Sequence, residues 1–508
     1  MSEGIVDLSE GRFAERLVDV CVVGSGPGGA TAARLLASRG LSVVVLEEGA
    51  DQGGVNLPRG ELARYDQLYS ERGGRTTDDL SVSILHGKTL GGGAVINACD
   101  VVPMPDAVKR HWATRFGLVD FSPEALARFE ARALEDLSPR EIPESEMGGS
   151  NVMLRRGTEE LGWRGEIMRD NRRGCVGFGQ CLIACPVGAK KTPRVVAIPA
   201  AIEHGATFLT RARAVRIVDA TSEVKTVDVR ALDPFGRRER DSLSIRARVV
   251  VLAANPIGTV PILLRSGLVG PHLGRHVSLQ PQLPVVAIFD DDVRAYRGIP
   301  QAYAVTEFER IDEEHGLGGF RIEGIMGTPG IVSSLLPVSG IPGKESMASY
   351  RRFAAALCLV PDAPTASIAL ENDRPKVRYV PDETVAARLR DAARAAARAF
   401  FAAGARRVLV PVSPPVVMER PADVAKLDGA AFFPARAPLL SAHQQGGARM
   451  ATSPKAGVTS PEGAVHGMRD VFVLDSSTYP SSSSSHTMTP ILTTAHALAV
   501  RVAGRLGR

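Results

Sequence analysis

Residues 19–49 read DVCVVGSGPGGATAARLLASRGLSVVVLEEG, and this stretch decides the fold. Residues 19–23 are short, apolar and rich in β-branched side chains, which is typical of a buried parallel strand. A glycine-rich turn follows, then an Ala- and Leu-rich helix that ends at a glycine, and then a second buried strand. The order strand, turn, helix, strand predicts a doubly wound α/β domain.

The glycines of the turn have separate tasks in such a fold. Gly24 permits the tight turn, Gly26 lets the backbone approach a pyrophosphate, and Gly29 lets the helix pack closely on the strand. The helix N-terminus offers unpaired N–H groups to phosphates. Glu47, at the end of the second strand, is placed to accept hydrogen bonds from ribose hydroxyls. The stretch therefore predicts a dinucleotide site, although by itself it does not distinguish FAD from NAD.

Composition narrows the class of protein. The 508 residues carry 61 basic and 56 acidic side chains, a net charge of +5, and no basic stripe with interleaved aromatics. We therefore expect no nucleic-acid partner. No run of 18 apolar residues occurs, so no membrane span is predicted. The N-terminus has early acidic residues and no apolar core of a secretory signal, so a cytoplasmic location is expected.

A second glycine cluster stands in residues 87–97, GKTLGGGAVIN. Gly91, Gly92 and Gly93 would let the backbone pass very close to a flat ligand or to another segment of chain. The apolar residues that follow could start a helix beneath the loop. We interpret the cluster as a second cofactor contact, with a plain packing turn as the alternative.

The C-terminal part contains three linked segments: LLSAHQQGGARM at 439–450, the predicted strand DVFVLD at 470–475, and SHTMT at 485–489 before an apolar helix. Five consecutive serines at 481–485 could be a flexible linker. We instead predict a packed segment, because the run is short and lies between a buried strand and a helix with apolar residues at helical spacing.

These motifs resemble those of the glucose-methanol-choline (GMC) oxidoreductase family, in particular cholesterol and glucose oxidases. The resemblance implies FAD, with residues 91–93 near the isoalloxazine and Asn97 beside the reacting centre. Some relatives carry, immediately before this Asn, a His bonded covalently to FAD; Ile96 stands there, so the flavin should be non-covalent. Ala94 replaces a usual Ser.

Further site residues come from the same resemblance. His443 and His486 match the family's catalytic pair, in which one imidazole, more often the second, accepts the hydroxyl proton and the other positions the substrate oxygen. Asp475 would contact the ribityl chain, and Val215 would lie where the backbone reads adenine. Glu323 matches a Glu that faces the substrate in cholesterol oxidases, with an exposed or ion-paired carboxylate as the alternative.

The predicted chemistry explains the histidine pair. Hydride transfer from an alcohol carbon requires the hydroxyl proton to leave, and an imidazole is a suitable general base near neutral pH. A second imidazole can hydrogen-bond the developing oxyanion. His496, inside the last predicted helix, has the context of a structural residue.

The cysteines in CVGFGQCLIACPVGAK (175–190) have the spacing Cys175-x5-Cys181-x3-Cys185. Close thiolates can bind metal, but this spacing fits neither common zinc patterns nor a four-Cys ferredoxin run. It resembles a segment of bacterial FAD-dependent glucose dehydrogenases that carries a three-iron cluster. We favour a structural turn with reduced thiols and no metal; an iron–sulfur cluster or a disulfide is the alternative.

The whole chain is therefore interpreted as an FAD-binding α/β domain over 1–275, with inserted loop segments around 100–170. An α+β substrate-binding domain follows over 276–430, and 431–508 return to the first domain with the histidine pair. The predicted function is oxidation of the CH–OH group of a lipophilic or bulky alcohol, with oxygen or another electron acceptor. The alternative is a non-oxidative lyase, isomerase or cyclase on the same scaffold.

Overall fold

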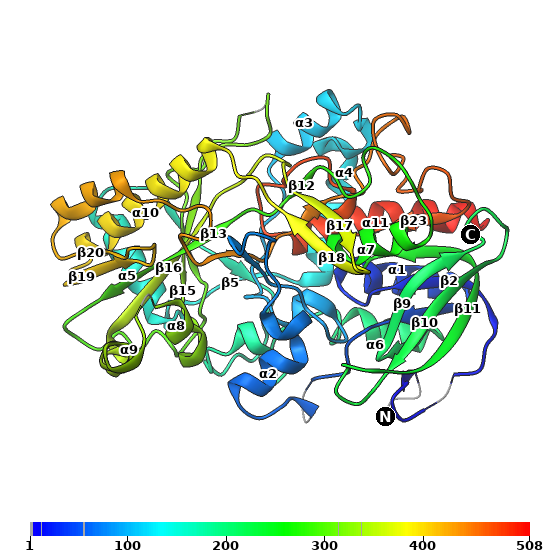
Figure 1. Ribbon diagram of the computed structural model, residues 1–508, viewed down its shortest axis with the longest axis horizontal. Helices are drawn as coiled ribbons and strands as arrows, with labels where there is room; N and C mark the ends of the chain where they lie inside the picture. The colour runs from blue at the N-terminus through cyan, green and yellow to red at the C-terminus, as the bar shows by residue number, and fades with distance from the viewer. Residues whose placement is uncertain (1–3, 12, 54–55, 313, 337) are drawn as a thin grey trace.

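The computed structural model describes residues 4–11, 13–53, 56–312, 314–336 and 338–508. Figure 1 shows an elongated molecule with two bodies side by side, each built on a β-sheet. The body at the right of the figure contains both ends of the chain. The body at the left is formed mainly by the middle of the sequence.

The first sheet has the strand order β1-β8-β3-β2-β11-β10-β9, with β23 paired to β11. Its strands from β1 to β11 run parallel to their neighbours, and β10 pairs antiparallel to both β9 and β11. The bounds are β1 (Ile5–Asp7), β2 (Leu17–Val23), β3 (Val43–Leu46), β8 (Thr207–Thr210), β9 (Ala212–Val218), β10 (Lys225–Leu232), β11 (Glu239–Leu252) and β23 (Val471–Val473).

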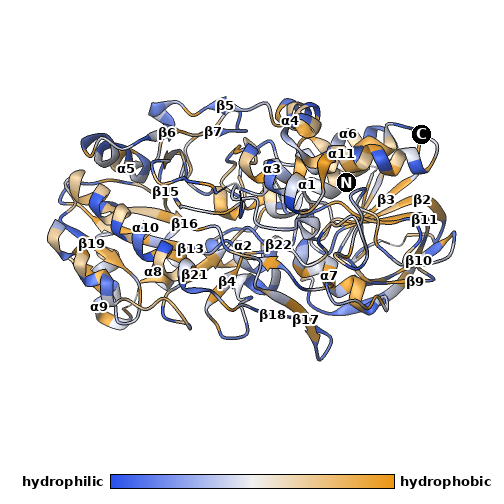
Figure 2. Ribbon diagram, turned by 90° about the horizontal axis from the view of Figure 1, so that it is seen from above, coloured by the Kyte–Doolittle hydropathy of each residue, from blue (hydrophilic) through white to orange (hydrophobic). Residues whose placement is uncertain are grey.

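The centre of this sheet is the opening motif of the sequence. Val20, Cys21 and Val22 of β2 are fully buried, as expected for a strand covered on both faces. Helix α1 (Pro27–Ala37) follows and packs against α6 (Ala197–Glu203) and against the C-terminal helix α11 (Met488–Arg505). Figure 2 shows the apolar character of β2, β3 and β11. The predicted doubly wound α/β fold is confirmed.

The second sheet has the order β20-β19-β13-β16-β15-β14-β6, with β21 paired to β13 and to β4. Its strands are β4 (Val82–Ile84), β6 (Gly165–Ile167), β13 (Gln282–Ile288), β14 (Tyr303–Val305), β15 (Arg321–Ile325), β16 (Phe353–Leu359), β19 (Arg407–Val410), β20 (Val416–Met418) and β21 (Leu439–Ser441). Helices α10 (Glu383–Ala402) and α5 (Gly149–Glu160) pack together and against this sheet. The short helices α8 (Pro329–Leu335) and α9 (Gly340–Ala348) lie at its other side in Figure 1.

The remaining helices and short strands lie outside the two large sheets. They are α2 (Glu61–Leu68), α3 (Asp106–Arg115), α4 (Pro123–Leu137), α7 (Asn255–Arg265), and the small strands β5 (Arg140–Glu141), β7 (Arg169–Asp170), β12 (Val277–Ser278), β17 (Ser367–Glu371), β18 (Arg374–Arg378) and β22 (Gln445–Gly446). Residues 149–167 pack on the second sheet, although the sequence interpretation counts them within the first domain. The boundaries at 275 and 430 stay predictions.

Two local expectations have a clear outcome. Residues 92–95 form a single 3-10 turn, and no α-helix begins at the apolar residues after the glycines. The alternative of a flexible serine linker is wrong, because Ser481, Ser482, Ser483 and Ser485 are buried. Among the described residues, no helix is long and apolar enough to cross a membrane.

Candidate active site

A cavity of about 1070 Å³ lies between the two bodies and takes its lining from both. One end is formed by the glycine turn before α1, by Glu47 and Glu48, and by residues 212–214. The other end is apolar and is formed by β13, β15, β16 and α8. His443 and His486 line the cavity together with Asn97 and Asp100.

The glycine turn fits a ligand that lies against the backbone. Gly24 has φ +99°, and a Cβ there would be 2.3 Å from the carbonyl oxygen of Ala253. Gly26 begins α1 without any side-chain cap, so the first N–H groups of the helix remain available to phosphate oxygens. Gly29 does not line the cavity; a Cβ there would be 1.9 Å from the oxygen of Gly24, so it serves close packing.

The acidic pair after β3 is already tied to the fold. Glu47 is buried and accepts hydrogen bonds from the Ser25 hydroxyl (2.6 Å) and the Gly49 N–H (2.8 Å). Burial raises the pKa of Glu47 in spite of these bonds. Glu48 forms ion pairs with Lys88 (3.3 Å) and Arg213 (3.0 Å). Glu47 therefore orders the turn and also lines the cavity, whereas its contact with a ribose stays a prediction.

The second glycine cluster lies directly on the first turn. A Cβ on Gly92 would be 2.7 Å from the Cα of Gly26, and the Gly91 N–H donates to the Ser25 hydroxyl at 2.9 Å. Gly92 and Gly93 line the cavity, whereas Gly91 does not. The cluster therefore packs on the first turn and forms part of the cavity wall, and its contact with a cofactor stays a prediction.

Three other predicted cofactor residues differ in position. Asn97 lines the cavity, and its side-chain amide is 3.2 Å from the sulfur of Met488. Asp475 is buried and accepts hydrogen bonds from the Asn255 N–H (2.9 Å) and the Thr259 hydroxyl (2.7 Å). Its carboxylate therefore orders the start of α7. Val215 is not part of the lining, which instead contains the neighbouring residues 212–214.

The histidine pair is assembled at the middle of the cavity. The ring centroids of His443 and His486 are 5.0 Å apart, with an interplanar angle of 69°. Nδ1 of His443 is 3.3 Å from the side-chain nitrogen of Gln282. Burial, with the positive charge of His486, lowers the pKa of His443 to about 3. His443 is therefore neutral at physiological pH.

His486 has the opposite electrostatic environment. Its Nε2 is 2.8 Å from the carboxylate of Glu323, and its Nδ1 is 3.8 Å from the carboxylate of Asp100. Burial by itself would lower the pKa of His486, but the charge and hydrogen bond of Glu323, with the charge of Asp100, raise it. The pair thus consists of one neutral imidazole and one that favours the cation.

Glu323 is fully buried on β15 and is held by three donors. Besides His486, it accepts from Nε of Arg321 at 2.5 Å and from the amide of Gln301. Burial opposes its ionisation, but His486 and Arg321 lower the pKa of Glu323 to about 2. Glu323 is therefore an ion-paired carboxylate, as the alternative interpretation states, and it also contacts His486.

Asp100, Glu323 and His486 each bring one ligand-type atom within 4.8 Å of the others. We assign no metal to this cluster, because the guanidinium of Arg321 bonds Glu323 and would repel a cation.

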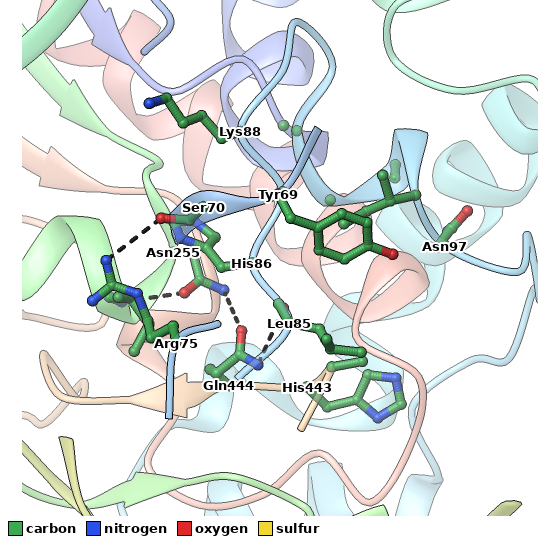
Figure 3. A pocket seen from close by; sticks show the side chains of 18 of the residues that line it. Tyr69, Ser70, Arg75, Leu85, His86, Lys88, Asn97, Asn255, His443 and Gln444 are labelled. Atoms are coloured by element: carbon green, nitrogen blue, oxygen red, sulfur yellow. Dashed lines mark hydrogen bonds between the residues drawn. The ribbon is translucent and has the colours of Figure 1, made fainter. Parts of the chain in front are cut away.

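The sequence interpretation missed several polar residues of the cavity. Five of them are Asp100, Gln282, Gln301, Asn255 and Gln444. Figure 3 shows the last two joined, with the Asn255 amide donating to the Gln444 oxygen at 3.3 Å. Two of them had a sequence signal: Gln444 directly follows His443 in the segment 439–450, and Asp100 lies three residues after Asn97, the last residue of the segment 87–97.

The three clustered cysteines lie outside the main cavity. Cys175, Cys181 and Cys185 line a separate void of about 20 Å³, and each has a free thiol, so no disulfide joins them. Sγ of Cys181 is 3.3 Å from the guanidinium of Arg172, which is itself buried. An iron–sulfur cluster at these residues stays an untested alternative.

A dinucleotide-binding turn, a histidine pair at one cavity and an adjacent apolar chamber define a nucleotide-dependent oxidoreductase of the Rossmann type. Family comparison gives the particular group. The family described as GMC oxidoreductase matches residues 65–282 and again 365–495, and a NAD(P)-binding Rossmann-like domain matches residues 22–59. The chain belongs to the GMC oxidoreductase family, and it is an enzyme of that flavoprotein class.

Individual relatives agree with this assignment. An uncharacterized GMC-type oxidoreductase of Mycobacterium tuberculosis is 34% identical over 481 residues, which cover 91% of this chain and 72% of that protein. The long-chain-alcohol oxidase FAO3 of Arabidopsis thaliana is 28% identical over 518 residues, covering 96% of this chain and 68% of that protein. The crystal structure of pyridoxine 4-oxidase from Mesorbium loti shares the fold, with a TM-score of 0.71, 16% identity, and coverage of 95% and 99%.

Proposed function

We propose that this protein oxidises the CH–OH group of a lipophilic alcohol to a carbonyl, with non-covalently bound FAD. The observation that carries the proposal is the position of His443 and His486. They lie in one cavity between a nucleotide-binding turn and an apolar chamber. A substrate in the chamber would present its hydroxyl to the two imidazoles.

The cavity fits FAD on the chemistry of its lining. Gly24, Gly26 and Gly92 have no side chains, so the backbone is exposed to a cofactor along this wall of the cavity. The unpaired N–H groups at the start of α1 suit a pyrophosphate. Bound FAD would supply the acceptor for two electrons. Ile96 offers no nucleophilic atom for a covalent link to the flavin.

The two histidines have different tasks in this proposal. No hydrogen bond to Nε2 of His443 occurs among the described residues, whereas both ring nitrogens of His486 face carboxylates. His443 is neutral and therefore accepts the hydroxyl proton as general base. His486, whose cationic form Glu323 favours, stabilises the negative charge that develops on the substrate oxygen. This assignment makes the first histidine the base, in contrast to the order that the family resemblance favoured.

The apolar end of the cavity supports a lipophilic substrate. Its lining contains ten aliphatic side chains from the second body: Val286, Ile325, Ile331, Val332, Leu335, Leu336, Leu357, Leu359, Leu409 and Leu440. Each aliphatic group that a substrate buries there contributes about 25 cal/mol per Å². A long-chain alcohol oxidase among the relatives accords with this choice.

The test is anaerobic reduction of the purified yellow holoenzyme by a series of primary alcohols of increasing chain length. We expect the oxidised-flavin absorbance to bleach, with rates that rise with chain length. Reoxidation by air or by an artificial acceptor then identifies the electron acceptor class. A flavin that no alcohol bleaches would contradict the proposal and favour a lyase, isomerase or cyclase on this scaffold.

A further inference from the structure

Asp100 is a buried carboxyl at the reacting end of the cavity that the histidine chemistry has not used. Its residue is 4% exposed, and it lines the cavity. One carboxylate oxygen, Oδ2, is 3.8 Å from Nδ1 of His486. The other, Oδ1, is buried without a hydrogen-bond partner among the described residues. A buried polar atom without a partner costs free energy unless a ligand or a proton satisfies it.

We propose that Asp100 holds the hydroxyl proton of the substrate after the alcohol has been oxidised. This inference rests on the proposed function and adds a proton-accepting residue to it. The alcohol loses a hydride to the oxidised cofactor and a proton to the protein, and leaves as the carbonyl compound. The carboxylate of Asp100 becomes a carboxylic acid, which returns its proton when the electrons pass to the acceptor.

The general base does not keep the proton itself. His443 has a pKa near 3, so at neutral pH its imidazolium gives the proton up readily. His486 already favours the cation, and Glu323 is saturated by its three donors, with a pKa near 2. Asp100 is the remaining carboxyl among the described residues of this reacting end.

The surroundings of Asp100 give it a suitable affinity for a proton. Its neighbours of variable or fixed charge are His486, Glu323, Arg172, Asp170 and Cys99. Burial and the charge of Glu323 outweigh the positive charges of His486 and Arg172 and raise the pKa of Asp100 to about 7. Reduction of the cofactor adds negative charge to the cavity and raises this pKa further, so reduction and protonation are coupled.

The first experiment measures proton release during anaerobic reduction by an alcohol, in weakly buffered solution at about pH 8 with an indicator dye. In the wild type we expect the proton to be retained. In Asp100→Asn we expect about one proton to appear in solution per flavin reduced. Asp120→Asn removes an exposed carboxylate outside the cavity lining and should behave as the wild type. Retention of the proton by Asp100→Asn would overturn the proposal.

A second experiment does not depend on alcohol oxidation. The wild-type holoenzyme is reduced by light with an external electron donor, and its infrared difference spectrum is recorded. We expect the carbonyl band of a protonated carboxyl to appear on reduction, and to shift when aspartate is labelled with ¹³C. A missing band, or one that ignores the label, would overturn the proposal. If no alcohol reduces the flavin, the proposed function fails, but this spectrum still tests proton uptake by an aspartate. Loss of the band in Asp100→Asn assigns it to Asp100, and a band that persists in this variant belongs to another buried aspartate such as Asp475 and would overturn the proposal.

Discussion

The contact between Glu323 and His486 allows the sharpest test of the site. The substitution Glu323→Gln keeps the shape of the side chain and removes its charge. Nε2 of His486 then loses a charge-assisted hydrogen bond of 2.8 Å. Such bonds contribute about 1.5–3 kcal/mol. Since 1.36 kcal/mol corresponds to about one pKa unit, we expect the pKa of His486 to fall by about 1 to 2.

The loss should appear in the rate at which alcohol reduces the flavin. Removal of a group that stabilises an oxyanion typically costs about 10²- to 10³-fold. We expect the rate of flavin reduction to fall about 100-fold near pH 8. Anaerobic stopped-flow spectroscopy measures this rate. Since a lower pKa requires a lower pH for protonation, the rate of the variant should recover partly as the pH decreases.

Glu166→Gln is the matched control for this substitution. Glu166 also accepts a hydrogen bond from Arg321, at 2.9 Å, but its side chain is 55% exposed, and within the described ranges no hydrogen bond or ion pair joins it to His486. Glu166→Gln should leave the rate of flavin reduction within about twofold of the wild type. A wild-type rate and pH profile in Glu323→Gln would refute the electrostatic role of Glu323. Equal damage by both variants would assign the effect to the position of Arg321 instead.

Three further predictions concern the cofactor, the base and the substrate. Gly24→Ala should lose bound FAD on gel filtration, because its Cβ would meet the oxygen of Ala253 at 2.3 Å; Gly40→Ala, with φ +78° and open space, should keep its flavin. His443→Gln should retain FAD but slow flavin reduction about 10²- to 10⁴-fold, and an unchanged rate would exclude it as the base. Leu357→Gln should raise the KM for long-chain alcohols about tenfold and leave the KM for short alcohols unchanged. Leu62 is 82% exposed, and Leu62→Gln should change neither KM.

The fold was predictable because its deciding signals are local. A run of β-branched residues, a glycine turn and an Ala-rich helix are adjacent in the chain, and each has a physical reason to adopt one conformation. The same holds for α11, whose apolar residues recur at helical spacing. The packing of α5 and β6 on the second sheet was not predictable, because their partners β14 and α10 lie more than 100 residues away.

The sequence by itself determined the family, the dinucleotide turn and the two histidines, since these depend on residue types at fixed spacings. Only the tertiary structure decided how the site is charged. Glu323 and His486 are separated by 163 residues, and Asp100 reaches His486 from yet another segment. A pKa depends on burial and on distances to charges, and no motif records either. The neutral state of His443, the cationic tendency of His486 and the free oxygen of Asp100 therefore became visible only in three dimensions.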